Sequence, residues 1–151
     1  ERILSHGSHS AIIPTLGPIG LMRSGMLGES IAKKVRETSC EQQKMLEASR
    51  VGVLTGWGTD VSLDYYSSNP GSEFLLRKER GWTAVEMLEQ ATINSARIIG
   101  MDDDLGTIKA GKIADLVIVD GKPDEDVAVM TKYPWRILQA GKVTCAEGVI
   151  G

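Results

Sequence analysis

The sequence predicts an α/β fold that is followed by a β-rich C-terminal part. Two short apolar runs, at residues 11–16 and 51–56, are separated by a charged segment with helical spacing, which is typical of a strand–helix–strand unit. After Gly100 the apolar residues no longer follow a helical period and gather in short β-branched runs. We therefore expect an α/β part over residues 1–100 and a β part over residues 101–151.

Length and composition indicate an ordinary soluble domain. The chain has 151 residues, of which 42% are hydrophobic and 25% charged, so it can bury a core. A net charge of −3 removes the usual electrostatic reason to expect nucleic acid or an anionic membrane as a partner. No apolar run approaches the roughly 20 residues that span a bilayer, and the N-terminal segment resembles no signal peptide. The first residue is Glu1 and not methionine, which suggests that upstream sequence is absent.

The two cysteines point to a reduced, cytoplasmic setting. Cys40 and Cys145 are far apart and form no Cys-x-x-Cys pair, so neither a disulfide framework nor a zinc knuckle is predicted. Neither has a base or ligand nearby in the sequence that would activate a thiolate. We expect both to be inert.

The strand–helix–strand unit accounts for the first part of the chain. Residues 11–16 predict a buried strand, and Gly17–Pro18 predicts a turn at its end. Residues 28–50 predict one or two amphipathic helices that cover one face of a sheet. Residues 51–56 predict the second strand, and residues 61–72, rich in Ser, Asn, Pro, Gly and Tyr, predict a long loop over an active face.

A longer helix is predicted from Thr83 to about Ile99. Thr83 and Glu86 have the spacing of a capping box, and Gly100 supplies a left-handed C-cap. One apolar stripe, interpreted as core packing, contains Val85, Leu88, Thr92, Ala96 and Ile99.

The C-terminal part has the signals of short strands. Residues 106–111 predict a turn-flanked extended piece, and residues 114–119 a β-branched strand that ends at the Asp120–Gly121 turn signal. Residues 136–144 predict a hairpin that turns at Ala140–Gly141.

Asp60 is the first candidate for chemistry. It follows the second predicted strand, and the carboxyl ends of parallel strands are where α/β barrels and open sheets place catalytic groups. Asp also caps loops through Asx-turns. On the Gly-Thr-Asp motif alone, a catalytic and a capping role stay equally open.

The other candidate residues each have an alternative structural role. His6 and His9 could be metal ligands, but an extended His-x-x-His segment does not place both rings on one face, so solvent-facing or hydrogen-bonded side chains remain the alternative. Trp57, Tyr65 and Tyr66 flank Asp60 and could line a substrate pocket or pack the loop onto its scaffold. No Gly-x-Ser-x-Gly motif or phosphate-binding loop is present in the sequence, so serine-triad and nucleotide chemistry are unsupported.

Several segments together resemble the metal-dependent amidohydrolase superfamily. The resemblance is most specific in the predicted helix and in the Leu-Gly-Thr-Ile-Lys-Ala-Gly-Lys-Ile-Ala-Asp run, and it spans nearly the whole chain. It is strongest toward imidazolonepropionase and dipeptide-cleaving enzymes. The segments that carry it are residues 13–16, 52–60, 81–97, 105–120 and 136–143.

The resemblance implies a fold and a metal site. In the family a (β/α)8 barrel carries the metal, and a small β-sandwich made from both chain ends packs beside it. Residues 1–100 would then be the last strands and helices of the barrel, and residues 101–151 the C-terminal strands of the composite sandwich. Asp60 would be the carboxylate at the end of the eighth strand, which binds a divalent metal, most simply zinc, and shuttles a proton. His6 would be the histidine after the sixth strand.

The resemblance also implies that the chain is incomplete as an enzyme. The family's His-x-His pair and its ligands from the fourth and fifth strands have no counterpart in the sequence. We expect a hydrolase of carbon–nitrogen bonds other than ordinary peptide bonds, with a small-molecule amide or cyclic substrate, that is inactive as this isolated fragment. The alternatives are a subunit that completes its site by assembly, for example as a homo-oligomer, and a non-catalytic domain that keeps the fold.

Overall fold

The computed structural model describes residues 10–23, 25, 28–37, 40–62, 71–146 and 149–150, and the description below concerns these residues. Its elements are β1 (Ala11–Ile12), α2 (Gly17–Arg23), α3 (Glu29–Glu37), α4 (Cys40–Arg50), β2 (Leu54–Thr55), α6 (Ser72–Glu79), α7 (Ala84–Glu89), the π-helix η1 (Gln90–Asn94), α8 (Ser95–Ile98), β3 (Leu116–Ile118), the 3-10 helix η2 (Val127–Thr131), β4 (Arg136–Gln139), β5 (Lys142–Ala146) and β6 (Val149–Ile150). None of the described helices is long and apolar enough to cross a membrane.

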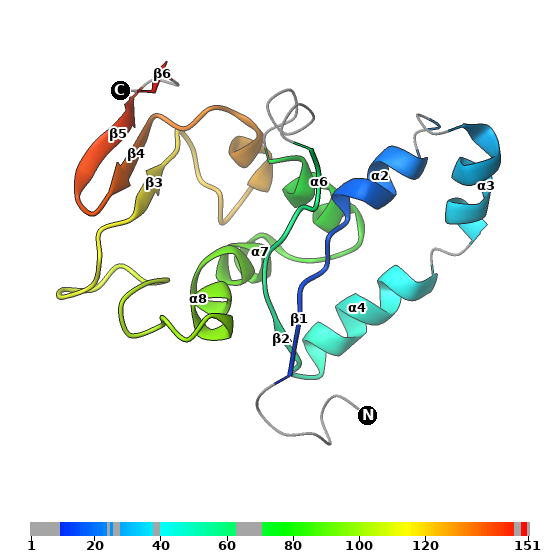
Figure 1. Ribbon diagram of the computed structural model, residues 1–151, viewed down its shortest axis with the longest axis horizontal. Coiled ribbons are helices and arrows are strands. Elements are labelled where there is room, and N and C mark those ends of the chain that lie inside the picture. The colour runs from blue at the N-terminus through cyan, green and yellow to red at the C-terminus, as the bar shows by residue number, and fades with distance from the viewer. Residues whose placement is uncertain are drawn as a thin grey trace.

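The predicted strand–helix–strand unit is confirmed. β1 and β2 pair in parallel, and Ile12 lies opposite Thr55. Helices α2, α3 and α4 connect the two strands and lie to one side of them, while α7 and α8 lie to the other (Figure 1). The strands are much shorter than the apolar runs that predict them, so most of each run continues as irregular backbone.

The prediction of a turn at Gly17–Pro18 is wrong, because α2 begins there. Proline is tolerated in the first turn of a helix, where its missing N–H leaves no bond unmade. The free backbone N–H groups of Leu16 and Gly17 donate to the carboxylate of Glu73, which lies far along the chain in α6. A distant carboxylate therefore stabilises this helix start, and no local sequence motif predicts that interaction.

Helix α6 is absent from the sequence-based prediction. The loop predicted over residues 61–72 reaches into its first residue, Ser72; residues 63–70 lie outside the described residues. The buried side chains of α6 are Glu73, Phe74 and Arg77. Charged residues are seldom fully buried. A helix whose buried face contains only one hydrophobic residue therefore lacks the amphipathic pattern by which a helix is predicted.

The long helix after Thr83 has the predicted start and end. Thr83 Oγ1 accepts from the backbone N–H of Glu86, and the Glu86 carboxylate accepts from the N–H of Thr83 at 2.6 Å, which confirms the capping box. Gly100 has φ 70°, as a left-handed cap requires.

The stripe predicted to face the core is wrong at three of its positions. Val85 is 52% exposed, Ile99 is 63% exposed and Thr92 is also exposed, whereas Met87, Gln90 and Ala96 are buried. The π turn η1 interrupts the helix, and its i→i+5 bonding inserts an extra residue that rotates the following face. A uniform period of 3.6 residues cannot follow that rotation.

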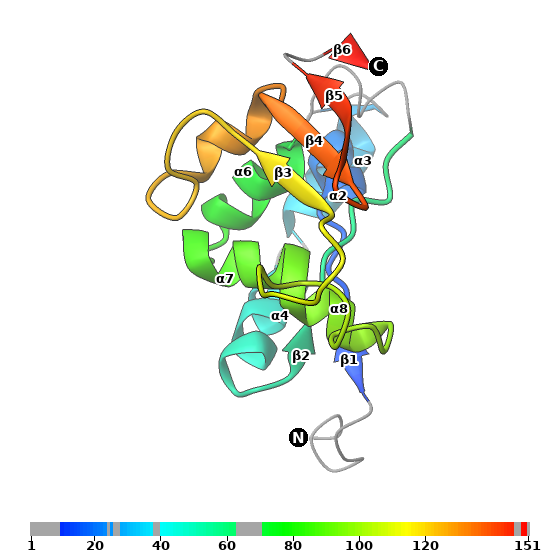
Figure 2. The same ribbon diagram turned by 90° about the vertical axis from the view of Figure 1, so that its left-hand side faces the viewer.

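The C-terminal strands form an antiparallel sheet in the order β3–β4–β5–β6, at the end of the molecule away from β1 and β2 (Figures 1 and 2). The predicted β4–β5 hairpin is confirmed, with Ala140 at φ 48° and Gly141 at φ 78°, the pair of positive angles of a type I′ turn. Residues 106–111, predicted to be extended, form bends and turns without strand pairing. A Cβ on Gly106 would lie 2.7 Å from Ile93 Cα, so a glycine lets this segment approach η1.

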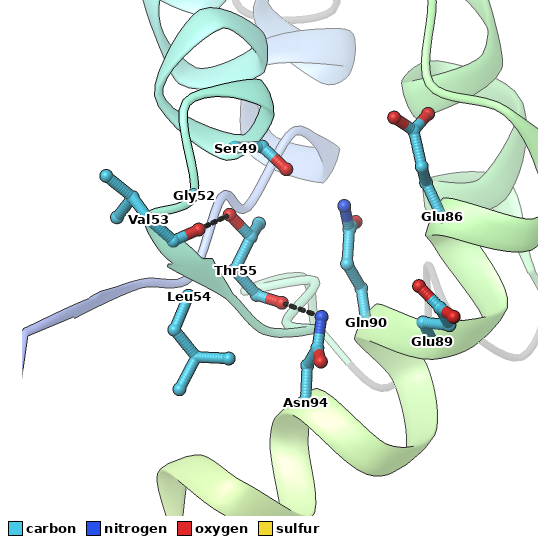
Figure 3. A pocket seen from close by; sticks show the side chains of 9 residues that line it. All are labelled: Ser49, Gly52, Val53, Leu54, Thr55, Glu86, Glu89, Gln90 and Asn94. Atoms are coloured by element: carbon cyan, nitrogen blue, oxygen red, sulfur yellow. Dashed lines mark hydrogen bonds between the residues drawn. The ribbon is translucent and has the colours of Figure 1, made fainter. Parts of the chain in front are cut away.

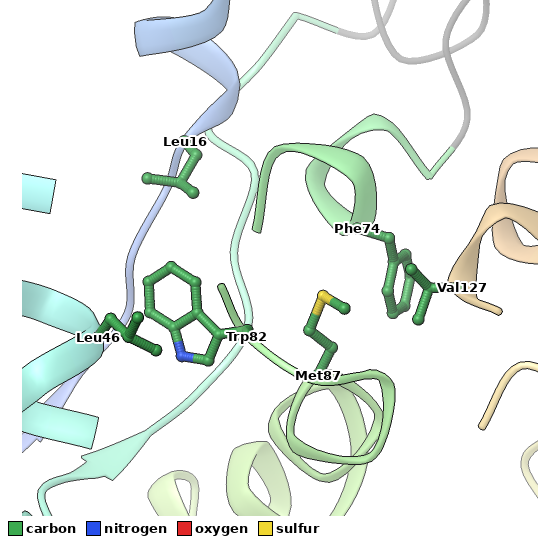
Figure 4. Close-up of a cluster of buried hydrophobic side chains, with 6 residues drawn as sticks. All are labelled: Leu16, Leu46, Phe74, Trp82, Met87 and Val127. Carbon is green, nitrogen blue, oxygen red and sulfur yellow. The ribbon is translucent and has the colours of Figure 1, made fainter. Parts of the chain in front are cut away.

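A single cluster of buried apolar side chains joins the elements that precede residue 100 to η2 (Figure 4). Val127 of η2 is 1% exposed and belongs to this cluster, so the part of the chain after residue 100 contributes to the same core. The cluster contains Leu16, Leu46, Phe74, Trp82, Met87 and Val127.

Candidate active site

Asp60 lies in the segment that leaves the C-terminal end of β2. Its side chain is exposed and its backbone has φ 49°, in the left-handed region. Asp is one of the few non-glycine residues that enter this region at low cost. The structure therefore places the candidate carboxylate beyond the carboxyl end of a parallel strand and open to solvent.

The start of α2 contacts the Asp60 segment directly. A Cβ on Gly17 would lie 2.7 Å from the carbonyl oxygen of Thr59 and 2.4 Å from Val61 Cγ1. Only a glycine lets the two backbones approach this closely. The position of Gly17 therefore constrains the backbone on both sides of Asp60.

A buried ion pair lies beneath the ends of both strands. Arg77 Nε donates to Glu73 Oε1 at 2.8 Å, and the two side chains are 0% and 1% exposed. The Glu73 carboxylate also accepts from Leu16 N and Gly17 N, each at 3.0 Å. Glu73 thus holds the backbone that follows β1.

Arg77 distributes its other hydrogen bonds over three further acceptors. Its guanidinium donates to the carbonyl of Gly56 at 3.1 Å, to the carbonyl of Pro14 and to Oε1 of Gln90. The guanidinium carbon lies 4.3 Å from the ring centroid of Trp57, a cation–π distance. A planar group with donors in several directions is suited to join backbone segments in this way.

The electrostatics of the pair follow from its burial. Desolvation raises the pKa of Glu73, while the hydrogen bond and charge of Arg77 and the two backbone donors act to lower it. Desolvation lowers the pKa of Arg77, and Glu73 opposes that shift. Each partner therefore opposes the desolvation of the other's charge.

The π turn connects the long helix to β2. Asn94 Nδ2 donates to the carbonyl of Thr55 at 3.2 Å, and Ser95 Oγ accepts from the backbone N–H of Trp57 at 3.1 Å. Ser95 Oγ in turn donates to the carbonyl of Gln90. Single π turns occur frequently at functional sites, and here one holds the backbone where β2 ends.

Trp57 packs as part of the scaffold. Its ring centroid lies 4.1 Å from that of Phe74, and Arg77 lies against it. These contacts favour the packing role over the pocket-lining role. Tyr65 and Tyr66, for which the same two roles are open, lie outside the described residues.

A pocket of about 250 Å³ lies along β2 and the residues that precede it (Figure 3). It opens between the α4–β2 connection and the long helix, and Gly52 and Val53, which precede β2, form part of its wall. Asp60 is not among its lining residues, which are Ser49, Gly52, Val53, Leu54, Thr55, Glu86, Glu89, Gln90 and Asn94. The pocket therefore shares Gln90 and Asn94 with the network at the strand ends but does not include Asp60.

The other sequence-based candidates do not join Asp60 in the described part of the chain. His6 and His9 lie outside it. Cys145 is a free thiol in β5, and nothing is described for the Cys40 side chain. Within the described ranges, no group of three or more His, Cys, Asp or Glu could hold a metal ion. An exposed carboxylate can serve as one ligand of a divalent cation. Asp60 could therefore supply one metal ligand by itself.

The residues that position the strand ends, Glu73, Arg77 and Gln90, were not predicted from the sequence. The only signal is that Glu73 and Arg77 are four residues apart, a spacing that joins side chains on a helix. Such pairs are mostly exposed and contribute little, so the spacing alone does not single them out.

Comparison with known families supplies the identification. The profile of the amidohydrolase family matches residues 12–138, which is most of the chain. The chain belongs to the amidohydrolase family. Its similarity to that family, expected from the sequence segments, is thereby confirmed.

Individual relatives show the extent of the similarity. A 5-methylthioadenosine/S-adenosylhomocysteine deaminase from Moorella thermoacetica is 29% identical over 78% of the chain, and an imidazolonepropionase from Streptococcus gordonii is 31% identical over 77%. A prolidase complexed with N-methylphosphonate-L-proline superposes with a TM-score of 0.79 and 29% identity over 95% of the chain. The chain spans 34%, 38% and 37% of the lengths of these proteins, respectively, so it corresponds to about a third of each.

Proposed function

We propose that this amidohydrolase-family chain is part of a metal-dependent hydrolase of carbon–nitrogen bonds other than ordinary peptide bonds, with Asp60 as metal ligand and proton shuttle. The observation that carries the proposal is the placement of Asp60, exposed beyond the carboxyl end of β2 in a segment that buried polar contacts hold. Family membership supplies the reaction class.

The proposed architecture follows the family. Residues 1–100 would form the last strands and helices of a (β/α)8 barrel, which the parallel β1–β2 pair and its connecting helices support. Residues 101–151 would form the C-terminal strands of a composite β-sandwich, which the antiparallel β3–β6 sheet supports. His6 remains our proposal for a second metal ligand.

A divalent cation, zinc in our proposal, would lower the pKa of a bound water to about 7 and polarise the substrate carbonyl. The Asp60 carboxylate, open to solvent, then accepts a proton from the attacking water. The same carboxyl group donates that proton to the departing nitrogen, which is a poor leaving group without it. One residue thus serves in turn as general base and general acid.

The substrate in this proposal is a small molecule with an amide or cyclic carbon–nitrogen bond. The names of the relatives, a 5-methylthioadenosine/S-adenosylhomocysteine deaminase, an imidazolonepropionase and a prolidase, support a small-molecule substrate. We propose a cytoplasmic protein without a nucleic-acid or membrane partner, inactive as this isolated chain. The alternative is a domain that acts only in a homo-oligomer or has no catalytic role.

The first test is the metal content of the gel-filtered chain, measured by mass spectrometry for the wild type, Asp60→Ala and the control Asp124→Ala. Asp124 is exposed and lies in the segment between β3 and η2. The control therefore removes one exposed carboxylate, as Asp60→Ala does. Near-stoichiometric metal that is lost only from Asp60→Ala supports the proposal. Equal metal in all three proteins contradicts it, and a metal-free, folded wild type means that this chain alone is not an enzyme and that the hydrolase activity belongs to its family.

A further inference from the structure

The pocket along β2 is lined on one side by polar side chains of the long helix. Glu86, Glu89, Gln90 and Asn94 belong to this wall, and Ser49 of α4 lies across from it (Figure 3). Residues four apart share one face of a helix, with about 5–6 Å between their Cβ atoms, so Glu86 and Gln90 are neighbours on that face. The volume of about 250 Å³ is below the roughly 300–1,000 Å³ of pockets for drug-sized ligands, so the pocket suits a small molecule.

Gln90 turns its amide nitrogen into this pocket (Figure 3). The residue is 2% exposed, and its Oε1 accepts from Arg77 Nη1. Because a guanidinium only donates, the amide oxygen has to face Arg77, which leaves Nε2 on the branch of the amide toward the pocket. Nε2 donates to none of the residues that the structure describes. A buried donor without an acceptor keeps its desolvation cost, so a ligand atom that accepts from Nε2 is stabilised there.

The two carboxylates beside Gln90 have no cationic partner in the described part of the chain. Glu86 gives one oxygen to the backbone N–H of Thr83, and Glu89 is exposed. None of the ion pairs between described residues includes either carboxylate. A hydrogen bond between a carboxylate and a cation is roughly twice as strong as one between neutral groups. The charge of this wall therefore favours a positively charged ligand.

We propose that the pocket along β2 binds a small organic cation, a primary ammonium with a hydrogen-bond acceptor a few bonds away. An ammonium has three donors, so it serves the carboxylates of both Glu86 and Glu89. The acceptor, a carbonyl or hydroxyl oxygen, takes a hydrogen bond from Gln90 Nε2. One helical turn separates Glu86 from Gln90, and this spacing sets the distance between the two groups of the ligand. The site excludes Asp60 and does not depend on the proposed function.

The test is a titration of the isotope-labelled chain with glycinamide, which carries both groups, followed by the NMR shifts of the backbone amides. We expect saturable shifts within residues 49–55 and 86–94, which border the pocket. Two probes of similar size each lack one group: isobutylamine has no acceptor, and propionamide has no ammonium. We expect each of them to bind several-fold more weakly than glycinamide, about the effect of one lost hydrogen bond.

Three variants locate the binding in the pocket. Glu89→Gln removes one charge and keeps the shape of the side chain, so glycinamide affinity should fall about three- to tenfold. The matched control Glu79→Gln removes an exposed carboxylate of α6 that does not line the pocket and should leave affinity unchanged. Ser49→Leu places a larger side chain in the wall of the pocket and should abolish the shifts. Should Ser49→Leu fail to fold, Glu89→Gln decides the question, because its side chain is exposed.

Three results would overturn the proposal. Equal losses of affinity in Glu79→Gln and Glu89→Gln would assign the binding to the overall negative charge of the chain and not to the pocket. Isobutylamine that binds as tightly as glycinamide would remove the role of Gln90 and with it the proposed class of ligand. The absence of saturable shifts with all three probes would show that the pocket holds only water.

Discussion

The strand ends beneath Asp60 and the C-terminal sheet are built in opposite ways. Under Asp60 the polar side chains are buried, and Glu73 and Arg77 are nearly inaccessible. In the sheet two apolar side chains are largely open, with Val117 59% and Val143 53% exposed. The first region is held by hydrogen bonds between residues far apart in the sequence, and the second by a local hairpin.

This difference shows which region can tolerate change. A buried polar network depends on every member, because an unpaired group in the interior keeps its full desolvation cost. A hairpin with solvent-exposed faces depends on its turn, and a single side chain on its surface matters little. We therefore expect a larger loss of stability from a change in the buried network than from one in the hairpin.

The largest effect is expected from Arg77→Met. It leaves the Glu73 carboxylate buried without its cation, and breaking such a pair typically costs about 3–5 kcal/mol. Urea unfolding of the variant should show this loss. The double variant Glu73→Gln/Arg77→Met leaves no unpaired charge and should recover part of the stability; a double variant less stable than Arg77→Met would contradict this account of the network.

A smaller effect is expected from Gly141→Ala in the β4–β5 turn. Gly141 has φ 78°, and the left-handed conformation costs a residue with a Cβ about 1–2 kcal/mol. A Cβ there would lie 3.9 Å from Ala114 Cβ, so no clash adds to that cost. Thermal unfolding measures it, with Val143→Ala on the exposed face as a control that should change stability by less than about 0.5 kcal/mol. Equal losses in both variants would show that the turn does not control the hairpin.

The smallest effect concerns the exposed pair of Lys78 and Asp126, which links α6 to the start of η2. The backbone N–H of Ala128 and the ammonium of Lys78 lower the pKa of Asp126 below its ordinary value of 3.8. A carboxyl whose pKa is lower in the folded state stabilises it above pH 3.8, and this contribution is lost as pH falls through the folded-state pKa. The Tm difference between the wild type and Asp126→Asn should therefore favour the wild type at neutral pH and disappear in acid. A difference that persists unchanged in acid would assign it to the Asn side chain and not to the charge.

The local elements of the fold were open to prediction from the sequence. The capping box at Thr83, the hairpin turn at Gly141 and the helices α3 and α4 each depend on residues within a few positions of one another. Asp60 was also identified as a candidate, because its position depends only on the end of the preceding strand.

Only the tertiary structure decided what holds the site. The helix start at Gly17 depends on a carboxylate from α6, and the buried face of α6 depends on backbone groups that follow β1 and β2. Within the long helix, the π turn at Gln90 shifts the buried face and brings that side chain to Arg77. The physical reason is range: a local motif contains both partners of its hydrogen bonds, whereas Arg77 finds its partners at Pro14, Gly56 and Gln90, which come together only when the chain is folded.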